Sequence, residues 1–273
     1  MPDPKYCYPD SNVLINKLNI RNHAELFESE KRITFARLQQ LQSNPLPGKY
    51  DFQHLKDIHR FIFQDIYAWA GQERTVEIGK GNLFCTTAYL QDYARSVFAK
   101  YFPECFAVRH NHTDFVRVLS ENYGDLNALH PFREGNGRAQ REFARLVCLR
   151  CGYVFDLSCS THSEMLAASK LSFDKGDSTG FISVFSRAVL PYNGEAGLLS
   201  SNRLNILTRD DLTIPAFGGY DYYESGEHIA SESYDKIYKA KILKMDAEMQ
   251  INEAKEEIET IENEERCYQG LSL

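Results

Sequence analysis

The chain has 273 residues, which is enough for one ordinary domain with an appendage or for two small domains. Hydrophobic residues make up 43% of it and charged residues 25%, as in a soluble globular protein. The formal net charge of −7 argues against a protein shaped as a whole to attract DNA or RNA, so any nucleotide must be held by a local group of cations and backbone amides.

Helical periodicity runs through most of the first 190 residues. A first helix is expected to stop at Asn44-Pro-Leu-Pro-Gly. A second is expected to begin after Asp51, a suitable N-cap, and to end before Gly71, because a helix C-cap favours a residue that tolerates positive φ. Further helices are predicted over residues 113–129, 136–150 and 178–189. The apolar positions that define the first three helices are Leu26, Phe27, Ile33, Phe35, Leu38 and Leu41, then Leu55, Ile58, Ile62, Ile66 and Trp69, then Phe115, Leu119, Tyr123 and Leu126.

Residues 74–85 break this helical pattern. Val76 and Ile78 alternate with polar residues before Gly79-Lys-Gly-Asn, and Leu83 or Phe84 follows, which is the pattern of two short strands around a glycine turn. A lone two-stranded hairpin is only marginally stable, so such a piece is expected to act at a surface. We therefore predict a β-hairpin flap over residues 74–85.

The composition changes near residue 191. Gly, Ser, Asn, Tyr and Asp dominate the following stretch, and residues 196–231 are interpreted as a linker or irregular segment. Residues 232–273 are interpreted as a C-terminal helical tail, because Ile and Ala recur at heptad spacing between Tyr234 and Glu265. This stripe suits docking on another helix of this chain or of a partner, and a solvated helix with a weak stripe explains it as well.

The cysteines and the apolar runs bear on the compartment. The seven cysteines are an odd number and do not show the regular spacing of a disulfide scaffold, which favours free thiols in a reducing environment. Cys148 and Cys151 form a C-x-x-C without a second Cys or His pair at zinc spacing, so we expect two packed helical thiols. No apolar run approaches the roughly 20 residues that cross a bilayer, and we see no secretory signal. We expect a cytoplasmic protein without membrane insertion, with delivery into another cell left open.

The segment from His130 to Arg141 concentrates groups suited to phosphate chemistry. Pro131 disfavours the α conformation at the residue before it, so His130 is expected on a rigid turn between two helices, where an imidazole can act as a general base. Gly135-Asn-Gly then leads into the next helix. Glycines there let backbone N–H groups converge on an anion, which the helix dipole also favours.

Three charged side chains lie beside these backbone N–H groups, which together form a phosphate nest. Arg138 in the first turn and Arg141 three residues later share a helix face, so both guanidiniums can reach one anion. Glu134 offers the hard oxygen that suits Mg²⁺ bridging phosphates. A base, a metal ligand, a phosphate nest and two arginines within this segment indicate phosphoryl or nucleotidyl transfer.

This run resembles the signature of the Fic (filamentation induced by cAMP) proteins, His-Pro-Phe-x-(Asp/Glu)-Gly-Asn-Gly-Arg-x-x-Arg, and every fixed position is met between residues 130 and 141. The resemblance extends over about residues 5–190, including the runs that begin at Tyr8, Asp65 and Lys80. It implies an all-α Fic-type domain over residues 1–195 with a small β-hairpin flap, followed by the C-terminal helix. It also implies a protein adenylyltransferase, which transfers AMP from ATP to a Ser, Thr or Tyr hydroxyl of a target protein.

The resemblance assigns roles to the residues of the signature and the flap. His130 would deprotonate the target hydroxyl, Phe132 would anchor the loop in the core, and Glu134 would bind Mg²⁺ on the phosphates of ATP. Nucleotide binding would fall to Gly135, Asn136, Gly137, Arg138 and Arg141. Docking of an extended target segment by strand addition would fall to Ile78, Lys80, Gly81 and Phe84.

Two details bear on the type of reaction and its control. The related Doc kinases carry Lys where this chain has Gly137, so Gly137 favours AMP transfer over phosphate transfer. Many Fic proteins carry an inhibitory Ser/Thr-x-x-x-Glu-Gly/Asn helix whose Glu would pair with Arg138 here, and residues 160–164 and 260–264 match it only in part. We expect the chain to lack intramolecular inhibition and a separate antitoxin-like partner to supply it, with a degenerate motif in the C-terminal helix left open.

Three alternative functions remain open from the sequence. An idle Fic-like module that only holds nucleotide is disfavoured by the presence of His130. Removal of AMP from modified proteins is disfavoured by the incomplete inhibitory motif, and a phosphotransferase is disfavoured by Gly137. The sequence indicates neither the target protein nor the oligomeric state.

Overall fold

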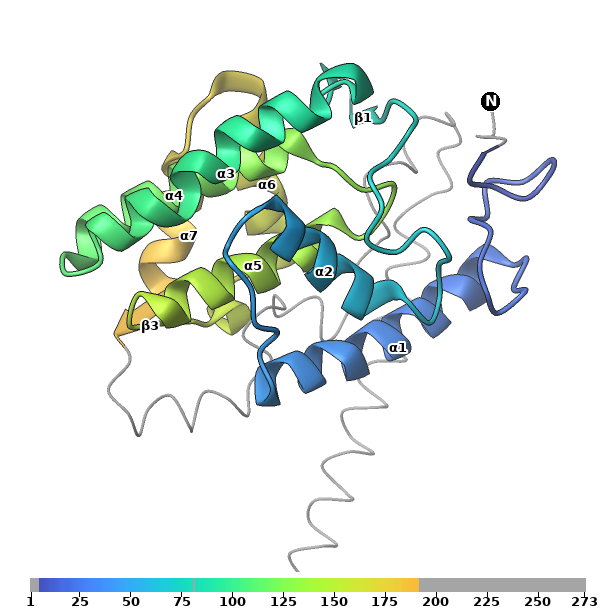
Figure 1. The fold of residues 1–273 in the computed structure, drawn as a ribbon, viewed down its shortest axis with the longest axis horizontal. Helices are drawn as coiled ribbons and strands as arrows, with labels where there is room; N and C mark the ends of the chain where they lie inside the picture. Colours follow the sequence, from blue (N-terminus) through green and yellow to red (C-terminus); the bar gives the residue numbers. More distant parts are fainter. Residues whose placement is uncertain (1–4, 81, 192–273) are drawn as a thin grey trace, which may run out of the picture. The chain divides into compact units, whose positions relative to one another are not determined.

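The computed structural model describes residues 5–80 and 82–191. This part of the chain contains seven α-helices (Figure 1). They are α1 His23–Ser43, α2 Phe52–Phe63, α3 Leu90–Ala107, α4 His112–Leu129, α5 Asn136–Arg150, α6 His162–Lys175 and α7 Thr179–Ala188. Two 3₁₀ helices, η1 Thr87–Tyr89 and η2 Leu157–Cys159, accompany them. The expected helical fold class is confirmed. The predicted linker over 196–231 and helical tail over 232–273 lie outside the described residues.

Side-chain caps explain where several of these helices begin. Asn22, Asp51 and Asn111 each accept a hydrogen bond from a backbone N–H in the first turn of α1, α2 and α4. Thr161 opens α6 with a capping box, in which its hydroxyl and the Glu164 carboxylate each satisfy a backbone N–H of the other residue. The predicted Asp51 cap is confirmed, as are the helices over 113–129, 136–150 and 178–189 to within a residue or so.

The second helix ends earlier than predicted. Ile66 and Trp69 lie in turns beyond α2 rather than on its apolar face. The carbonyl of Ile66 accepts the N–H of Lys17 at 2.7 Å, and the N–H of Ala70, which a continued helix would direct to Ile66, donates to the carbonyl of Tyr67 instead. Gly71 has a positive φ of 79°, as predicted, but its N–H donates to Nδ1 of His59 at 2.9 Å, so it folds back on α2 instead of capping it.

The described residues contain two antiparallel pairs of strands, where the sequence predicts one. In the flap, β1 Gly79–Lys80 pairs with β2 Asn82–Leu83, so the residues predicted as the turn form the ladder, and Val76 and Ile78 precede it. The second pair, β3 Tyr153–Phe155 with β4 Val189–Pro191, joins the chain after α5 to the chain after α7. Strands of three residues that pair across such a separation leave no local pattern to detect.

The long buried helix α5 fixes the position of the signature segment. It packs against α2 on one side and α4 on another, while α4 also contacts α3, α6 and α7 (Figure 1). Every residue of α5 from Ala139 to Cys148 is buried, and the charges of Glu142 and Arg145 pair at 2.7 Å within the helix. A helix enclosed in this way holds its N-terminus rigidly.

The described cysteines are all free thiols. Cys148 and Cys151 are buried, and burial raises the pKa of both, as expected for two packed thiols. Within residues 5–80 and 82–191, no helix has the length and apolar character needed to span a membrane.

Candidate active site

His130 is the C-terminal cap of α4 and adopts a left-handed backbone conformation with φ 42° and ψ 61°. Pro131 disfavours the α conformation there, so the chain turns at this residue. The imidazole is buried, its Nδ1 lies 3.1 Å from the carbonyl oxygen of Asn127, and the ring of Phe84 stacks on it with centroids 3.8 Å apart. Because a carbonyl only accepts, Nδ1 donates in this contact, which leaves Nε2 as the nitrogen that can carry a lone pair.

Asn136 closes the loop between α4 and α5. Its Oδ1 accepts the N–H of Phe132 at 2.9 Å, and its Nδ2 donates to the carbonyl of Phe132 at 2.7 Å. The ring of Phe132 is fully buried beneath this loop. The side chain of Asn136 is thus engaged inside the loop, which leaves only its backbone N–H for the phosphate contact that the family resemblance implies.

The start of α5 requires small residues. Gly135 is the N-cap with a φ of 81°, and a Cβ at this position would overlap the ring of Phe63. A Cβ at Gly137 would lie 3.2 Å from Nη1 of Arg141, so a side chain there would press on this guanidinium. Gly135 supplies no side-chain cap to α5, and an N-terminus with bare N–H groups favours an anion.

Arg138 turns from the signature segment toward α1. One of its nitrogens donates to the carboxylate of Glu30, another donates to the hydroxyl of Thr34 at 3.2 Å, and its guanidinium lies over the ring of Phe63 at 4.6 Å. The hydroxyl of Tyr67 donates to the second oxygen of Glu30. Burial opposes the charge of Arg138, but the Glu30 and Glu134 carboxylates outweigh it and raise the pKa of the guanidinium, so Arg138 stays charged.

The sequence pattern did not identify Glu30 and Thr34. They lie on the buried face of α1, between Leu26 and Leu38 at four-residue spacing. A carboxylate at an apolar-face position signals a buried partner, because an unpaired buried charge is strongly unfavourable. Glu30 also lies outside both partial inhibitory motifs, so the glutamate bound to Arg138 comes from the first helix rather than from either of them.

Glu134 lies between Gly135 and Arg138. Its Oε1 accepts the N–H of Gly135 at 2.9 Å and lies 3.5 Å from Nη2 of Arg138. No cluster of three or more metal-binding side chains occurs in the described part of the chain. Mg²⁺ on a nucleotide usually takes one or two carboxylates and keeps water and phosphate oxygens as its other ligands, so a single carboxylate beside an anion-binding helix end fits this ion.

His59 of α2 holds the backbone of Glu134 and is a further residue that the sequence pattern did not identify. Because its Nδ1 accepts the N–H of Gly71, its Nε2 carries the proton and donates to the carbonyl of Glu134 at 2.8 Å. Its ring stacks on Phe132 with centroids 3.8 Å apart. Burial lowers the pKa of His59 to about 3, so the ring is neutral and fixed in one tautomer at physiological pH.

The flap presents side chains other than those predicted for docking. Ile78 and Phe84 are only 8% and 5% exposed, because they point into the protein, and Phe84 reaches His130. The exposed apolar side chain is Leu83, at 60%. Gly81 and the side chain of Lys80 lie outside what the structure describes.

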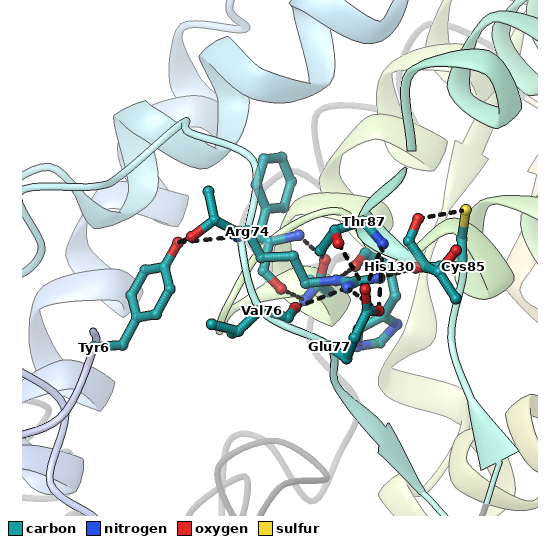
Figure 2. Close-up of polar contacts among 11 residues, drawn as sticks. Tyr6, Arg74, Val76, Glu77, Cys85, Thr87 and His130 are labelled. Carbon is teal, nitrogen blue, oxygen red and sulfur yellow. Dashed lines mark hydrogen bonds and ion pairs between the residues drawn. The ribbon is translucent and has the colours of Figure 1, made fainter. Parts of the chain in front are cut away.

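Arg74 joins the flap to the signature turn (Figure 2). It is buried, its Nε donates to the carbonyl of His130 at 2.9 Å, and its Nη1 donates to the carbonyl of Val76 at 2.9 Å. Its Nη2 donates to the carbonyl of Cys85, and its backbone N–H donates to the carbonyl of Pro131 at 2.8 Å. Sequence reasoning placed Arg74 at the edge of the flap without giving it a role.

The structure therefore divides the predicted site into two groups. Glu134 contacts both Gly135 and Arg138, and Gly137 lies close to Arg141. His130 instead contacts α4 and the flap. The single closed loop from His130 to Asn136 connects the two groups.

Comparisons with known proteins bear on the family of this chain. Residues 49–148 match the family model of the Fic/DOC family. The chain is 37% identical over 169 residues to the probable protein adenylyltransferase y4lH of Sinorhizobium fredii, an alignment that covers 61% of this chain and 86% of that one. It is 34% identical over 188 residues to the probable protein adenylyltransferase Fic of Escherichia coli, covering 68% and 92% of the two chains.

Solved structures share the fold. The N-terminal Fic domain of a VirB-translocated Bep effector from Bartonella quintana, with bound ADP, matches with a TM-score of 0.66 and 25% identity, covering 73% of this chain and all of that one. The match to the family model includes the whole signature, and the relatives align over most of their own length. This chain belongs to the Fic/DOC family.

Proposed function

We propose that this protein is a protein adenylyltransferase that moves AMP from ATP to a Ser, Thr or Tyr hydroxyl of a target protein. One observation carries the proposal: a buried imidazole whose Nδ1 lies against a carbonyl oxygen and a helix end that starts with glycine occupy one closed loop. The first can accept a proton and the second can bind a phosphate. Membership of the family and the names of the relatives support the same activity.

The phosphates of ATP would lie on the N-terminus of α5. The backbone N–H groups of Asn136 and Gly137 would bind them, because the N–H of Gly135 already donates to the carboxylate of Glu134. Gly135 would contribute by starting the helix without a side chain, Arg138 would contact the terminal phosphates, and Arg141 would support them. Gly137 favours AMP transfer, because a lysine in its place, as in the Doc kinases, would fill the space for the α-phosphate and suit a nucleotide bound in the reverse orientation.

Glu134 would hold Mg²⁺ on the α- and β-phosphates, where the ion would neutralise phosphate charge. The backbone of Glu134 is held by His59, and its carboxylate by the N–H of Gly135, so the ligand is oriented before the nucleotide arrives.

The transfer step uses His130 as the base. The target hydroxyl oxygen forms a bond to the α-phosphorus of ATP while Nε2 of His130 takes the hydroxyl proton. The bond from the α-phosphorus to the bridging oxygen breaks, and pyrophosphate leaves with the electron pair. Arg138, which is charged, would stabilise the negative charge of the leaving group.

The target would dock on the flap as an added strand. Backbone pairing gives such docking most of its affinity, and the exposed Leu83 offers an apolar contact for a target side chain. We propose that the protein acts in the cytoplasm on such targets, and that any inhibitor is a separate antitoxin-like protein.

Labelled ATP tests the proposal. The full-length protein is incubated with a cell lysate and ATP labelled in either the α- or the γ-phosphate, beside His130→Ala. We expect protein-bound label from the α position only, and its loss in the variant while ATP binding persists, because a lost general base lowers the rate by about 10²–10⁴-fold. Label from the γ position alone would make the protein a kinase, and ATP binding without transfer would make it an idle nucleotide-binding module.

A further inference from the structure

The flap is too small to hold its own position. Its ladder pairs Gly79 with Leu83 and Lys80 with Asn82, and one more bond runs from the N–H of Phe84 to the carbonyl of Ile78 at 3.1 Å. A two-stranded hairpin of this size is marginal alone. Its position relative to the rest of the protein must therefore come from contacts at its base.

Those contacts converge on one guanidinium. Arg74 binds the carbonyl of Val76 where the chain enters the flap and the carbonyl of Cys85 where the chain leaves it. The same group binds the carbonyl of His130 (Figure 2). The two ends of the flap and the turn that carries the imidazole are thereby tied to one rigid, planar side chain.

Neighbouring contacts reinforce this junction. The N–H of Cys85 donates to the carbonyl of Ala128 in α4 at 3.0 Å. Glu77 accepts the N–H and the hydroxyl of Thr87 at 2.9 and 2.6 Å and lies 3.5 Å from Arg74 (Figure 2). The hydrogen bonds from Thr87, and then the charge of Arg74, hold the pKa of Glu77 below its usual value, so the carboxylate stays charged beside the guanidinium.

We propose that Arg74 is a positioning residue that sets the flap at a fixed height above His130, so that a target strand added to the flap brings its hydroxyl to Nε2. This inference rests on the proposed function. Arg74 acts through other groups: it holds the carbonyl of His130, a residue in a left-handed conformation that non-glycine residues seldom adopt. Phe84, which directly follows Leu83, stacks on the imidazole and gives the flap a second contact with the base.

Arginine is required by the geometry of the three acceptors. The guanidinium donates from Nε, Nη1 and Nη2 to three separate carbonyls, which uses its planar fork of donors. A lysine ammonium is a point charge on a flexible stem and cannot span all three at once. Arg74→Lys therefore keeps the charge and removes the fork.

The experiment compares Arg74→Lys with Arg145→Lys, a control variant that replaces another buried arginine by lysine. Arg145 binds Glu142 of its own helix and, at 3.1 Å, the carbonyl of Leu41 in α1, so these partners belong to helices rather than to the flap. Steady-state transfer to a target protein, the Kd of an ATP analogue, the Tm and hydrogen exchange of peptides from the flap are measured for the wild type and both variants.

We expect Arg74→Lys to lower kcat/KM for the target by at least about tenfold, because small misplacements of reacting groups slow transfer steeply, while the Kd of the ATP analogue changes less than about twofold. Flap peptides should exchange faster in this variant only. At a similar loss of Tm, Arg145→Lys should keep kcat/KM within about twofold of the wild type. Equal losses of kcat/KM and equal flap exchange in the two variants would overturn the proposal.

A double-mutant cycle with Leu83→Ala supplies a second criterion. If Arg74 positions the flap, Leu83→Ala should raise the KM for the target in the wild-type background and raise it much less in the Arg74→Lys background. Independent, multiplicative effects would reduce Arg74 to a general support of the fold. Should the wild type transfer no AMP to any protein, the proposed function fails, whereas unchanged flap exchange in Arg74→Lys refutes the positioning role alone.

Discussion

Replacing Gly135 with alanine tests whether the start of α5 requires a residue without a side chain. The φ of Gly135 is 81°, and a left-handed conformation costs an alanine about 1–2 kcal/mol. Gly152 has a φ of 87° and open space within 4 Å of where a Cβ would lie, so Gly152→Ala should lose only this backbone contribution. The difference between the two variants isolates the effect of the ring above Gly135.

That ring belongs to Phe63, which has no room to move. It is fully buried, stacks on His59 with centroids 4.6 Å apart, and lies under the guanidinium of Arg138 at 4.6 Å. Overpacking a rigid core site costs about 1–3 kcal/mol. Gly135→Ala should therefore lose about 2–5 kcal/mol of unfolding free energy in total, from the backbone and packing contributions together.

Urea unfolding followed by circular dichroism measures this loss, and calorimetric titration with a non-hydrolysable ATP analogue measures the binding. Gly135→Ala should weaken nucleotide binding by about tenfold or more, because the displaced ring moves Arg138, while Gly152→Ala should leave binding unchanged. Adding Phe63→Leu, which makes room for the methyl group, should recover part of both losses. Equal unfolding free energies and equal affinities for the two alanine variants would refute the close packing of Phe63 on Gly135.

The residues that support the signature segment give three further predictions. Glu30→Gln should cost on the order of 3 kcal/mol of unfolding free energy, because it leaves Arg138 as a buried charge without its main partner, whereas Asp65→Asn, at a surface ion pair, should cost less than about 1 kcal/mol. Burial lowers the folded pKa of His59 from 6.5 to about 3, so between these values the unfolded chain binds a proton that the folded chain does not. The unfolding free energy should fall by up to about 1.4 kcal/mol per unit as the pH drops through this window, and His59→Gln should remove that slope in urea unfolding at pH 6 and pH 4. Phe84→Leu removes the stacking on the imidazole and should lower kcat with an unchanged Kd for the ATP analogue; an unchanged kcat would show that the stacking does not orient the base.

The local part of the site was predictable from the sequence because short-range backbone rules determine it. Pro131 fixes the turn at His130, and Gly135 is needed at a positive φ one residue before α5. The predicted end of α2 was wrong, because beyond Phe63 the carbonyl of Ile66 accepts the N–H of Lys17 rather than that of Ala70, which a continued helix would supply. Periodicity reports which surfaces are apolar, and it does not report which distant donor will bind a given carbonyl.

Three residues outside the signature segment hold its functional groups in place, and periodicity did not identify any of these contacts. Glu30 holds the guanidinium of Arg138, His59 holds the carbonyl of Glu134, and Arg74 holds the carbonyl of His130. These supports come from α1, α2 and the base of the flap, and each acts on a different functional residue.

Each support is separated from the residue it holds by at least 56 positions in the chain, so no local rule places it. In the proposed reaction the signature supplies the reacting groups, and the preceding segments set their geometry. Because transfer rates depend steeply on the placement of reacting atoms, a chain with an intact signature and altered supports should bind ATP and transfer AMP slowly. The signature is therefore necessary for the proposed activity, and the three distant supports decide whether it is sufficient.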